Sequence, residues 1–306
     1  MSTVNSTRSA VGSQGRFALP RFLPTLAWGS FVANVAIIGT GGAVRLTGSG
    51  LGCPTWPLCT AESLVPTEEM GIHGIIEFGN RTLTGVLGIL ALLVFIRVWR
   101  IRGQRRDLFV LAAIVLVGIL AQAVVGGITV LTDLNPIIVG FHYVASLILV
   151  CVTAAFLARM RETPGPRERV VPTGFAVLTH VNSLVLAVTV FVGVLTTGAG
   201  PHSGDAAVGR NGFDAVWLSH VHAWPGYVLA ALTLALAIWA LLKRLRPKAW
   251  LGVLLLVVVV QVLVGVYQAR NGLPAFAVGV HMVLASLAAA AQTVVILRLK
   301  RGTQVQ

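Results

Sequence analysis

Charged residues are scarce in this chain of 306 residues, and acidic residues are the scarcest. Asp and Glu together number 10, Lys and Arg number 23, and all four make up 11% of the sequence against 56% hydrophobic residues. With a mean hydropathy of +0.86, the chain has far more apolar surface than a soluble domain of this length can bury. The composition excludes an ordinary soluble domain and predicts that lipid covers the remaining apolar surface.

Apolar runs long enough to cross a membrane fill most of the chain. Crossing about 30 Å of hydrocarbon takes roughly 20 helical residues. The interiors of the runs hold few charges, and clusters of Pro, Gly and charged residues separate them. The sequence therefore predicts an all-α integral membrane protein with eight transmembrane helices, at about 23–44, 73–96, 108–131, 137–158, 174–196, 216–242, 249–269 and 275–297.

The net charge of +13 lies mostly on one side of the predicted membrane. If the N-terminus is cytoplasmic, most Lys and Arg fall in cytoplasmic tails and loops, which satisfies the positive-inside rule for an even number of spans. We therefore expect a multi-pass protein of a prokaryotic plasma membrane, with both termini cytoplasmic and no nucleic acid as partner. The N-terminal tail has no features of a cleaved secretory signal, so the first apolar run is expected to remain as a span.

A block of sequence occurs twice, and each copy ends in a histidine. Gln, Gly, Gly and His recur at identical spacings, first as Gln122, Gly126, Gly140 and His142 and then as Gln261, Gly265, Gly279 and His281. A duplication with four spans in each copy predicts two pseudo-symmetric four-helix bundles, related by an axis along the membrane normal. The predicted order is cytoplasmic tail, N-terminal bundle, cytoplasmic linker, C-terminal bundle and cytoplasmic tail, at 1–22, 23–158, 159–173, 174–297 and 298–306.

Imidazoles occur at matched depths inside the predicted spans. His142 and His281 each lie about two turns from the outside end of the last helix of their half, and His222 lies at a similar depth in the sixth span. A single histidine in a membrane helix often makes only a helix-to-helix hydrogen bond. Two imidazoles at one depth in one bundle are what a six-coordinate heme iron requires, so His222 and His281 are the predicted ligands. Small residues nearby leave room for a flat macrocycle: Gly140, Gly226, Ala285 and Ala288.

The second span carries an acidic residue among its apolar ones. Asn80 occupies the place that corresponds to His222, Glu77 precedes it by about one turn, and Arg81 follows it. Glu77 and Arg81, four residues apart, can form an ion pair and nothing more. Alternatively, the carboxylate borders a cavity of the N-terminal half and takes protons or polarises water where a substrate is oxidised. His73, farther out on the same helix, could approach the same cavity from its rim, but it is expected at the surface.

Three cysteines are present, and two of them share the first outside loop. Cys53 and Cys59 flank a short stretch with two prolines, which favours a turn and a disulfide in an oxidising compartment. A disulfide there would staple the loop. A metal-binding pair and a dithiol that cycles between redox states are the alternatives. Cys151, inside the fourth span, is expected to be a small core residue.

These residues together resemble the heme A synthase family, of bacterial type. The resemblance rests on the segment VRLTGSGLGCPTWPLC at 44–59, on Glu77 and Arg81, on TGAGPHSGD at 197–205 and on His281. It covers nearly all of the chain after the first twenty residues, and its loop signature is specific. The resemblance implies eight spans in two four-helix bundles and an enzyme that oxidises the C8 methyl group of heme O to the formyl group of heme A by successive hydroxylations. The product serves terminal oxidases.

The resemblance also implies roles for particular positions. His222 and His281 match the pair that ligates heme b, the expected electron-transfer cofactor, and Glu77 matches a carboxylate held to be important for catalysis. His142 matches one member of the pair at the substrate heme, whereas Asn80 stands where a histidine before arginine is expected. The alternatives for the substrate iron are then five-coordination, a bound water, or another ligand such as His73. Cys53 and Cys59 match a loop pair, and heme O synthase and an electron donor are implied partners. Side chains that can meet heme propionates are Arg45, Arg81 and His202.

Two other functions fit parts of the pattern. A membrane cytochrome b that only transfers electrons fits the repeated histidines, but it does not explain the unequal pair Asn80 and His142. A transporter fits the duplicated bundle, but it leaves the cysteine loop unexplained.

Overall fold

The computed structural model describes residues 19–205 and 208–303 and is built almost entirely of helices in that part of the chain. The long helices are α1 (Leu23–Leu46), α2 (Gly71–Trp99), α3 (Arg106–Leu131), α4 (Pro136–Met160), α5 (Thr173–Ala199), α6 (Ala215–Leu242), α7 (Lys248–Arg270) and α8 (Ala275–Leu297), and a short 3-10 helix, η1, spans Glu68–Met70. All eight are long and apolar enough to cross a membrane, which confirms the predicted all-α class and the predicted spans. Most helices extend slightly beyond the predicted runs, because polar residues at a helix end do not register as apolar sequence.

Two of the three helices that carry the predicted ligands begin at side-chain caps. The side chain of Asn135 accepts a hydrogen bond from the backbone N–H of Ile137, and Pro136 occupies the first turn of α4. The side chain of Asp214 accepts from the backbone N–H of Trp217 at the start of α6. These caps fix where each helix begins, and therefore the depth at which His142 and His222 lie.

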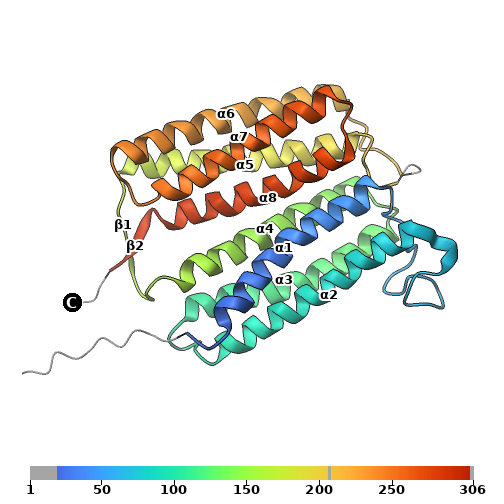
Figure 1. The fold of residues 1–306 in the computed structure, drawn as a ribbon, viewed down its shortest axis with the longest axis horizontal. Coiled ribbons are helices and arrows are strands. Elements are labelled where there is room, and N and C mark those ends of the chain that lie inside the picture. The colour runs from blue at the N-terminus through green and yellow to red at the C-terminus, as the bar shows by residue number, and fades with distance from the viewer. Residues whose placement is uncertain (1–18, 206–207, 304–306) are drawn as a thin grey trace, which may run out of the picture.

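The helices contact one another in two groups of four, which follow each other along the chain (Figure 1). In the first group α1 contacts α2, α2 contacts α3, α3 contacts α4, and α4 returns to α1; α5 to α8 repeat this order. The groups meet where α8 packs against α1 and α4, and α4 also contacts α5. Large apolar side chains remain exposed on the outside of both groups, as in Ile137, Leu242 and Phe276, which suits a surface covered by lipid.

The predicted linker and C-terminal tail are joined by a small sheet. β1 (Arg167–Arg169) pairs antiparallel with β2 (Lys300–Gly302), and Glu162 accepts ion pairs from Arg167 at 2.6 Å and Arg246 at 2.7 Å. The amino-acid sequence does not predict these strands, because three residues are too few to show a period of two. Most of the N-terminal tail and the last three residues of the chain lie outside the described residues.

Candidate functional site

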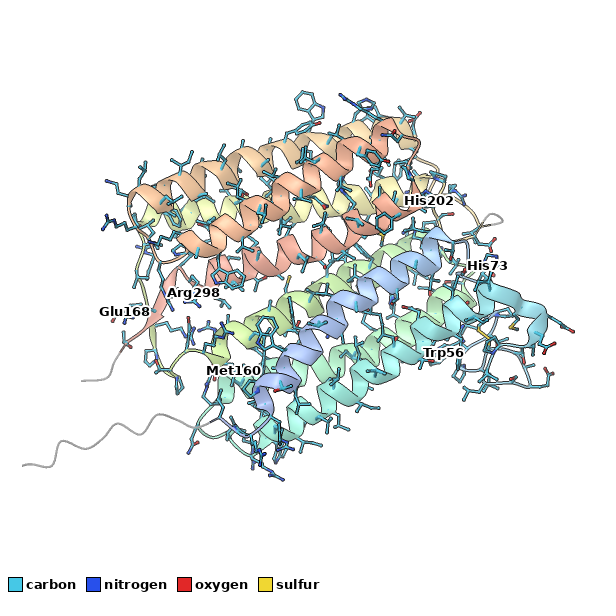
Figure 2. The ribbon with its side chains drawn as sticks, viewed as in Figure 1. Trp56, His73, Met160, Glu168, His202 and Arg298 are labelled. Carbon is cyan, nitrogen blue, oxygen red and sulfur yellow. A yellow bond between two sulfur atoms is a disulfide. The ribbon has the colours of Figure 1, made fainter. Side chains whose placement is uncertain are left out.

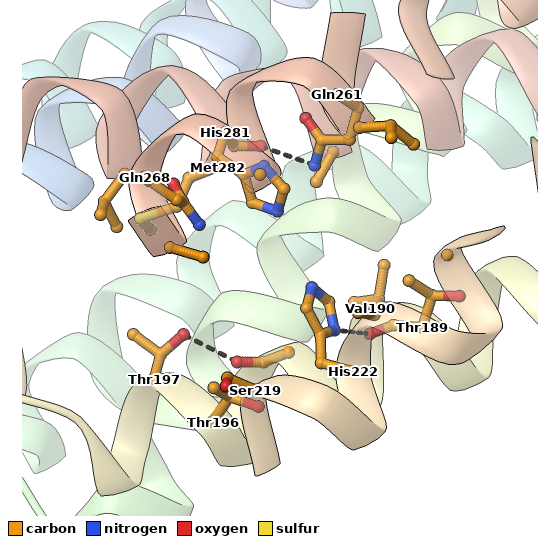
Figure 3. A pocket seen from close by; sticks show the side chains of 18 of the residues that line it. Thr189, Val190, Thr196, Thr197, Ser219, His222, Gln261, Gln268, His281 and Met282 are labelled. Carbon is orange, nitrogen blue, oxygen red and sulfur yellow. Dashed lines mark hydrogen bonds between the residues drawn. The ribbon is translucent and has the colours of Figure 1, made fainter. Parts of the chain in front are cut away.

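A cavity of about 400 Å³ lies among helices α5 to α8 (Figure 3). This volume falls within the range of about 300–1,000 Å³ that is usual for small-molecule and cofactor sites. Its walls include the four small residues that were predicted to leave room for a macrocycle: Gly140, Gly226, Ala285 and Ala288. Arg45 of α1 and Tyr143 of α4 also line it. The cavity therefore belongs mainly to the second group of helices but is closed in part by the first.

Two imidazoles face each other across this cavity. The ring centroids of His222 and His281 are 6.1 Å apart, and the ring planes are inclined by 73°. The Nδ1 atom of His222 lies 3.0 Å from the backbone carbonyl oxygen of Thr189, so its Nε2 atom is left to point across the cavity toward His281 (Figure 3). The hydrogen bond to the carbonyl selects the tautomer with a proton on Nδ1 and a free lone pair on Nε2.

Glycines stand behind both imidazoles. A β-carbon placed on Gly193 would lie 2.8 Å from Cε1 of His222, and one on Gly265 would lie 3.2 Å from Cε1 of His281. Both distances are shorter than ordinary van der Waals contact, so any side chain at either position would push the ring out of place. Gly265 belongs to the repeated block and could be singled out from the sequence. Gly193 could not, because the sequence of an apolar helix does not indicate which side chain packs against a glycine.

The repeated block is now explained by its contacts. The side-chain amide of Gln261 donates to the backbone carbonyl of His281 at 3.0 Å, and Gln122 donates in the same way to His142 at 2.7 Å. Gly126 packs against the ring of His142, as Gly265 packs against the ring of His281. A β-carbon on Gly126 would lie 3.4 Å from Cε1 of His142. Each copy therefore holds one histidine with a glutamine and a glycine from the preceding helix.

The imidazoles of the two copies also share an unusual feature. The Nδ1 atoms of His142 and His281 are both buried and have no hydrogen-bond partner among the described residues. A buried polar atom without a partner costs free energy, on the order of 1–3 kcal/mol. Such atoms are often found where a ligand or a water completes the site.

The geometry of the C-terminal pair fits a metal ion held between two nitrogens. A bond from a metal ion to an imidazole nitrogen is about 2 Å long, and the nitrogen lies roughly 1 Å from its ring centroid, so two such ligands place the centroids about 6 Å apart. The pair could supply two nitrogen ligands from opposite walls of the cavity, which is lined mainly by apolar residues. Two such nitrogens are the ligand set that a six-coordinate heme iron requires.

A cation lines the same cavity at the C-terminal end of α1. Arg45, in the last turn of α1, donates from Nε to the backbone carbonyl of His202 at 2.5 Å, and none of the ion pairs between described residues includes it. His202 itself contacts the carbonyl oxygen of Leu273 through Nε2 at 2.9 Å. Arg45 is therefore free to meet an acidic group of a ligand, whereas His202 serves to join two loops.

The N-terminal group of helices holds its polar residues differently. Asn80 accepts a hydrogen bond from the hydroxyl group of Thr40 on α1 at 2.8 Å. No hydrogen bond joins Asn80 to His142 in the described part of the chain. The structure thus joins the Asn80 side chain to α1.

Glu77 and Arg81 are bound to each other and to the first loop. Glu77 is buried, and its Oε1 atom accepts from Nε of Arg81 at 3.1 Å and from Nη2 at 2.5 Å. Its Oε2 atom accepts from the backbone N–H of Cys53 at 2.6 Å. The ion pair that the sequence analysis considered is therefore present, and the same carboxylate also fixes the loop.

The cysteines lie as predicted. Cys53 and Cys59 form a disulfide with an S–S distance of 2.02 Å, which confirms the predicted pairing. Cys151 is a free, half-buried residue of α4. His73 is exposed at the start of α2, where its Nδ1 atom lies 2.9 Å from the hydroxyl group of Ser49.

Comparison with known proteins identifies the family. Residues 24–203, more than half of the chain, match the family described as cytochrome oxidase assembly protein, COX15-CtaA. The chain is similar to the heme A synthase of Halalkalibacterium halodurans, with 26% identity over 84% of this chain and 90% of that protein. The heme A synthase of Lysinibacillus sphaericus is 35% identical over 42% of this chain and 41% of that protein, and the heme A synthase of Bacillus mycoides is 34% identical over 42% of each. With its spanning helices, the chain is a multi-pass membrane protein that belongs to the COX15-CtaA family of cytochrome oxidase assembly proteins.

Proposed function

We propose that this protein is a heme A synthase, an oxidoreductase that converts the C8 methyl group of heme O to the formyl group of heme A by successive hydroxylations. The observation that carries the proposal is the pair of imidazoles facing each other across an apolar cavity. The names of the similar proteins support the same reaction. The protein would act in the lipid bilayer, where both the substrate and its product are soluble.

The C-terminal half is proposed to hold heme b between His222 and His281. When bound, heme b supplies one-electron redox chemistry. The backbone carbonyl of Thr189 sets the tautomer of one ligand, and Gln261 fixes the helix position of the other. Apolar walls exclude water from the pair, and Arg45 offers a cation to an acidic substituent at the outside end.

The N-terminal half is proposed to hold the substrate. His142 is the proposed iron ligand there, with Asn80 and Arg81 as neighbours and Glu77 as the catalytic carboxylate that takes or supplies a proton. His142 is held by Gln122 and Gly126 in the way that His281 is held in the other half, which supports an equivalent role. An amide is a poor ligand for iron, so Asn80 would leave one side of the substrate iron free of protein nitrogen.

The arrangement in the membrane is part of the proposal. We propose that the bundles at 23–158 and 174–297 are pseudo-symmetric, that the linker at 159–173 is cytoplasmic, and that both termini are cytoplasmic. The matched glutamine and glycine contacts support the symmetry, and the distribution of Lys and Arg supports the orientation. A heme O synthase that supplies the substrate and an electron donor are the expected partners.

Heme A formation tests the function directly. The chain is expressed in a host that has a heme O synthase but makes no heme A, and extracted pigments are separated and identified. Heme A is expected only where the full chain is present. A purified protein that contains low-spin heme but yields no heme A would instead support a cytochrome b that only transfers electrons, because the histidine pair alone suits that function as well.

The glycine behind His222 provides a first structural prediction. Gly193→Ala is expected to displace the His222 ring, because the new β-carbon would lie 2.8 Å from Cε1. The purified variant should carry substantially less six-coordinate, low-spin heme than the wild type, measured from its absorption spectrum and heme content. Gly252→Ala is the control, since nothing lies within 4 Å of a β-carbon there. Equal low-spin spectra in both variants would contradict this arrangement.

Asn80 provides a second prediction. Asn80→His adds an imidazole at the position that corresponds to His222, and is expected to shift the spectrum of bound heme O toward six-coordinate, low-spin iron. Asn80→Ala is the matched control, because it removes the contact with Thr40 without supplying a ligand. If the spectra of heme O bound to the two variants are identical, Asn80 does not border the substrate iron.

A further inference from the structure

The first outside loop runs along helix α2 instead of standing above it. The hydroxyl group of Ser49 meets His73 near the start of α2, and the backbone N–H of Cys53 meets Glu77 one turn farther along. Arg81, another turn along, binds the loop at Thr55. From His73 to Arg81 the helix rises by about 12 Å. The loop therefore extends along the first turns of α2, with Trp56 beside the helices (Figure 2).

All five N–H donors of Arg81 are engaged, two by Glu77 and three by carbonyl groups of this loop. A guanidinium group has five N–H groups. In Arg81, Nε and one N–H of Nη2 bind Glu77, the other N–H of Nη2 binds the carbonyl of Cys53 at 2.9 Å, and Nη1 binds the carbonyls of Thr55 at 2.9 Å and Leu58 at 3.2 Å. None is left for a propionate of a substrate. Arg81 is instead the anchor of the residues on either side of Trp56.

Trp56 is inserted against a glycine of α3. A β-carbon on Gly127 would lie 2.3 Å from Cδ2 of the indole and 2.7 Å from Cγ, so no other residue fits there while the indole keeps its place. Gly127 follows Gly126, which lies behind His142. The indole therefore packs on α3 one residue from the contact that holds the proposed iron ligand.

The C-terminal half has a different residue at the position that corresponds to Gly127. By the spacing of the repeat, Gly126 corresponds to Gly265 and Gly127 corresponds to Val266. Val266 lines the cavity that contains the facing imidazoles. In the N-terminal half this position is Gly127, which has no side chain, and the indole of Trp56 from the loop packs against it. Trp56 is still 37% exposed, so the loop and α3 do not enclose the indole completely.

We propose that Trp56 forms a wall of the substrate site, delivered by the loop at 49–58 and held there by Arg81, and that its indole packs against the macrocycle of bound heme O. This inference rests on the proposed function. A flat, electron-rich indole packs well against a flat aromatic ring and adds contact that an aliphatic residue does not provide. Trp56 is thus a substrate-contacting residue, and Arg81 is a positioning residue that acts through it.

The test measures heme O binding to the purified, full-length protein carrying its own heme. Trp56→Ala and Gly127→Ala are each expected to raise the dissociation constant for heme O about tenfold, because Trp56→Ala removes the indole and Gly127→Ala displaces it. Trp56→Phe, which keeps an aromatic ring, should lose no more than about threefold. Gly88→Ala is the control, since a β-carbon there has no neighbour within 4 Å.

Two further readings separate the possible results. Retention of the low-spin spectrum of the C-terminal heme verifies that each variant is folded. If folded Trp56→Ala and Gly127→Ala both bind heme O as tightly as the wild type, the inference is wrong and the proposed function is untouched. If the wild type itself binds no heme O and forms no heme A, the proposed function is wrong, and the inference is rejected with it.

Discussion

His222→Ala and His281→Ala are each expected to abolish the low-spin heme signal of the purified protein. The two rings face each other with centroids 6.1 Å apart, and each supplies one of the two nitrogens that the proposed heme b needs. Loss of an outer-shell partner alone typically costs about 10–100-fold in metal affinity, and loss of a ligand should cost more. Heme content and the reduced absorption spectrum measure the effect.

The control for these variants is a histidine in the same half that faces away from the cavity. His180 of α5 is exposed and is not among the residues that line the cavity, so His180→Ala should keep the wild-type spectrum. Rescue adds a sharper criterion. His281→Gly leaves a space beside Gly265 that free imidazole can enter, and added imidazole should restore the six-coordinate spectrum. Low-spin heme retained in both alanine variants without imidazole would refute the pairing.

The spanning helices could be predicted from sequence because lipid imposes a strong and local requirement. A run of about 20 apolar residues is needed to cross the hydrocarbon, and no tertiary information is required to see it. The equivalence of His142 and His281 could also be predicted, because the duplication repeats Gln, Gly and His at fixed spacing. The contacts of Gln261 with His281 and of Gln122 with His142 now give the physical reason for that spacing.

The loop could not be placed in the same way. Its path along α2 depends on contacts between residues more than twenty positions apart, such as Cys53 with Glu77, and irregular segments have no period from which a partner can be inferred. Trp56 illustrates the difficulty. A tryptophan between two prolines suggests a turn at the surface, and a glycine in an apolar helix suggests close helix packing. Only the structure brings Trp56 and Gly127 together.

Glu77→Gln is expected to lower the rate of heme A formation by about 10²-fold or more, the usual range for loss of a general acid or base. Among the described residues, Glu77 is the one acidic side chain that lies more than a turn inside a spanning helix. The C-terminal heme should be retained, because His222 and His281 lie in the other group of helices. Heme A formed per folded protein is the measurement, and a wild-type rate in Glu77→Gln would rule out the catalytic role.

The same carboxylate holds the loop, so its two roles must be separated. If Glu77 acts only by anchoring the loop, then Glu77→Gln should weaken heme O binding as Trp56→Ala does, and the rate at saturating heme O should stay close to that of the wild type. If Glu77 handles protons, the rate should fall at saturating heme O while binding changes little. Arg81→Lys is the matched variant, because lysine keeps the charge but cannot reproduce the five-donor fork that binds Cys53, Thr55 and Leu58. It should resemble the binding defect of Trp56→Ala, and a different defect in Glu77→Gln would then belong to the carboxylate itself.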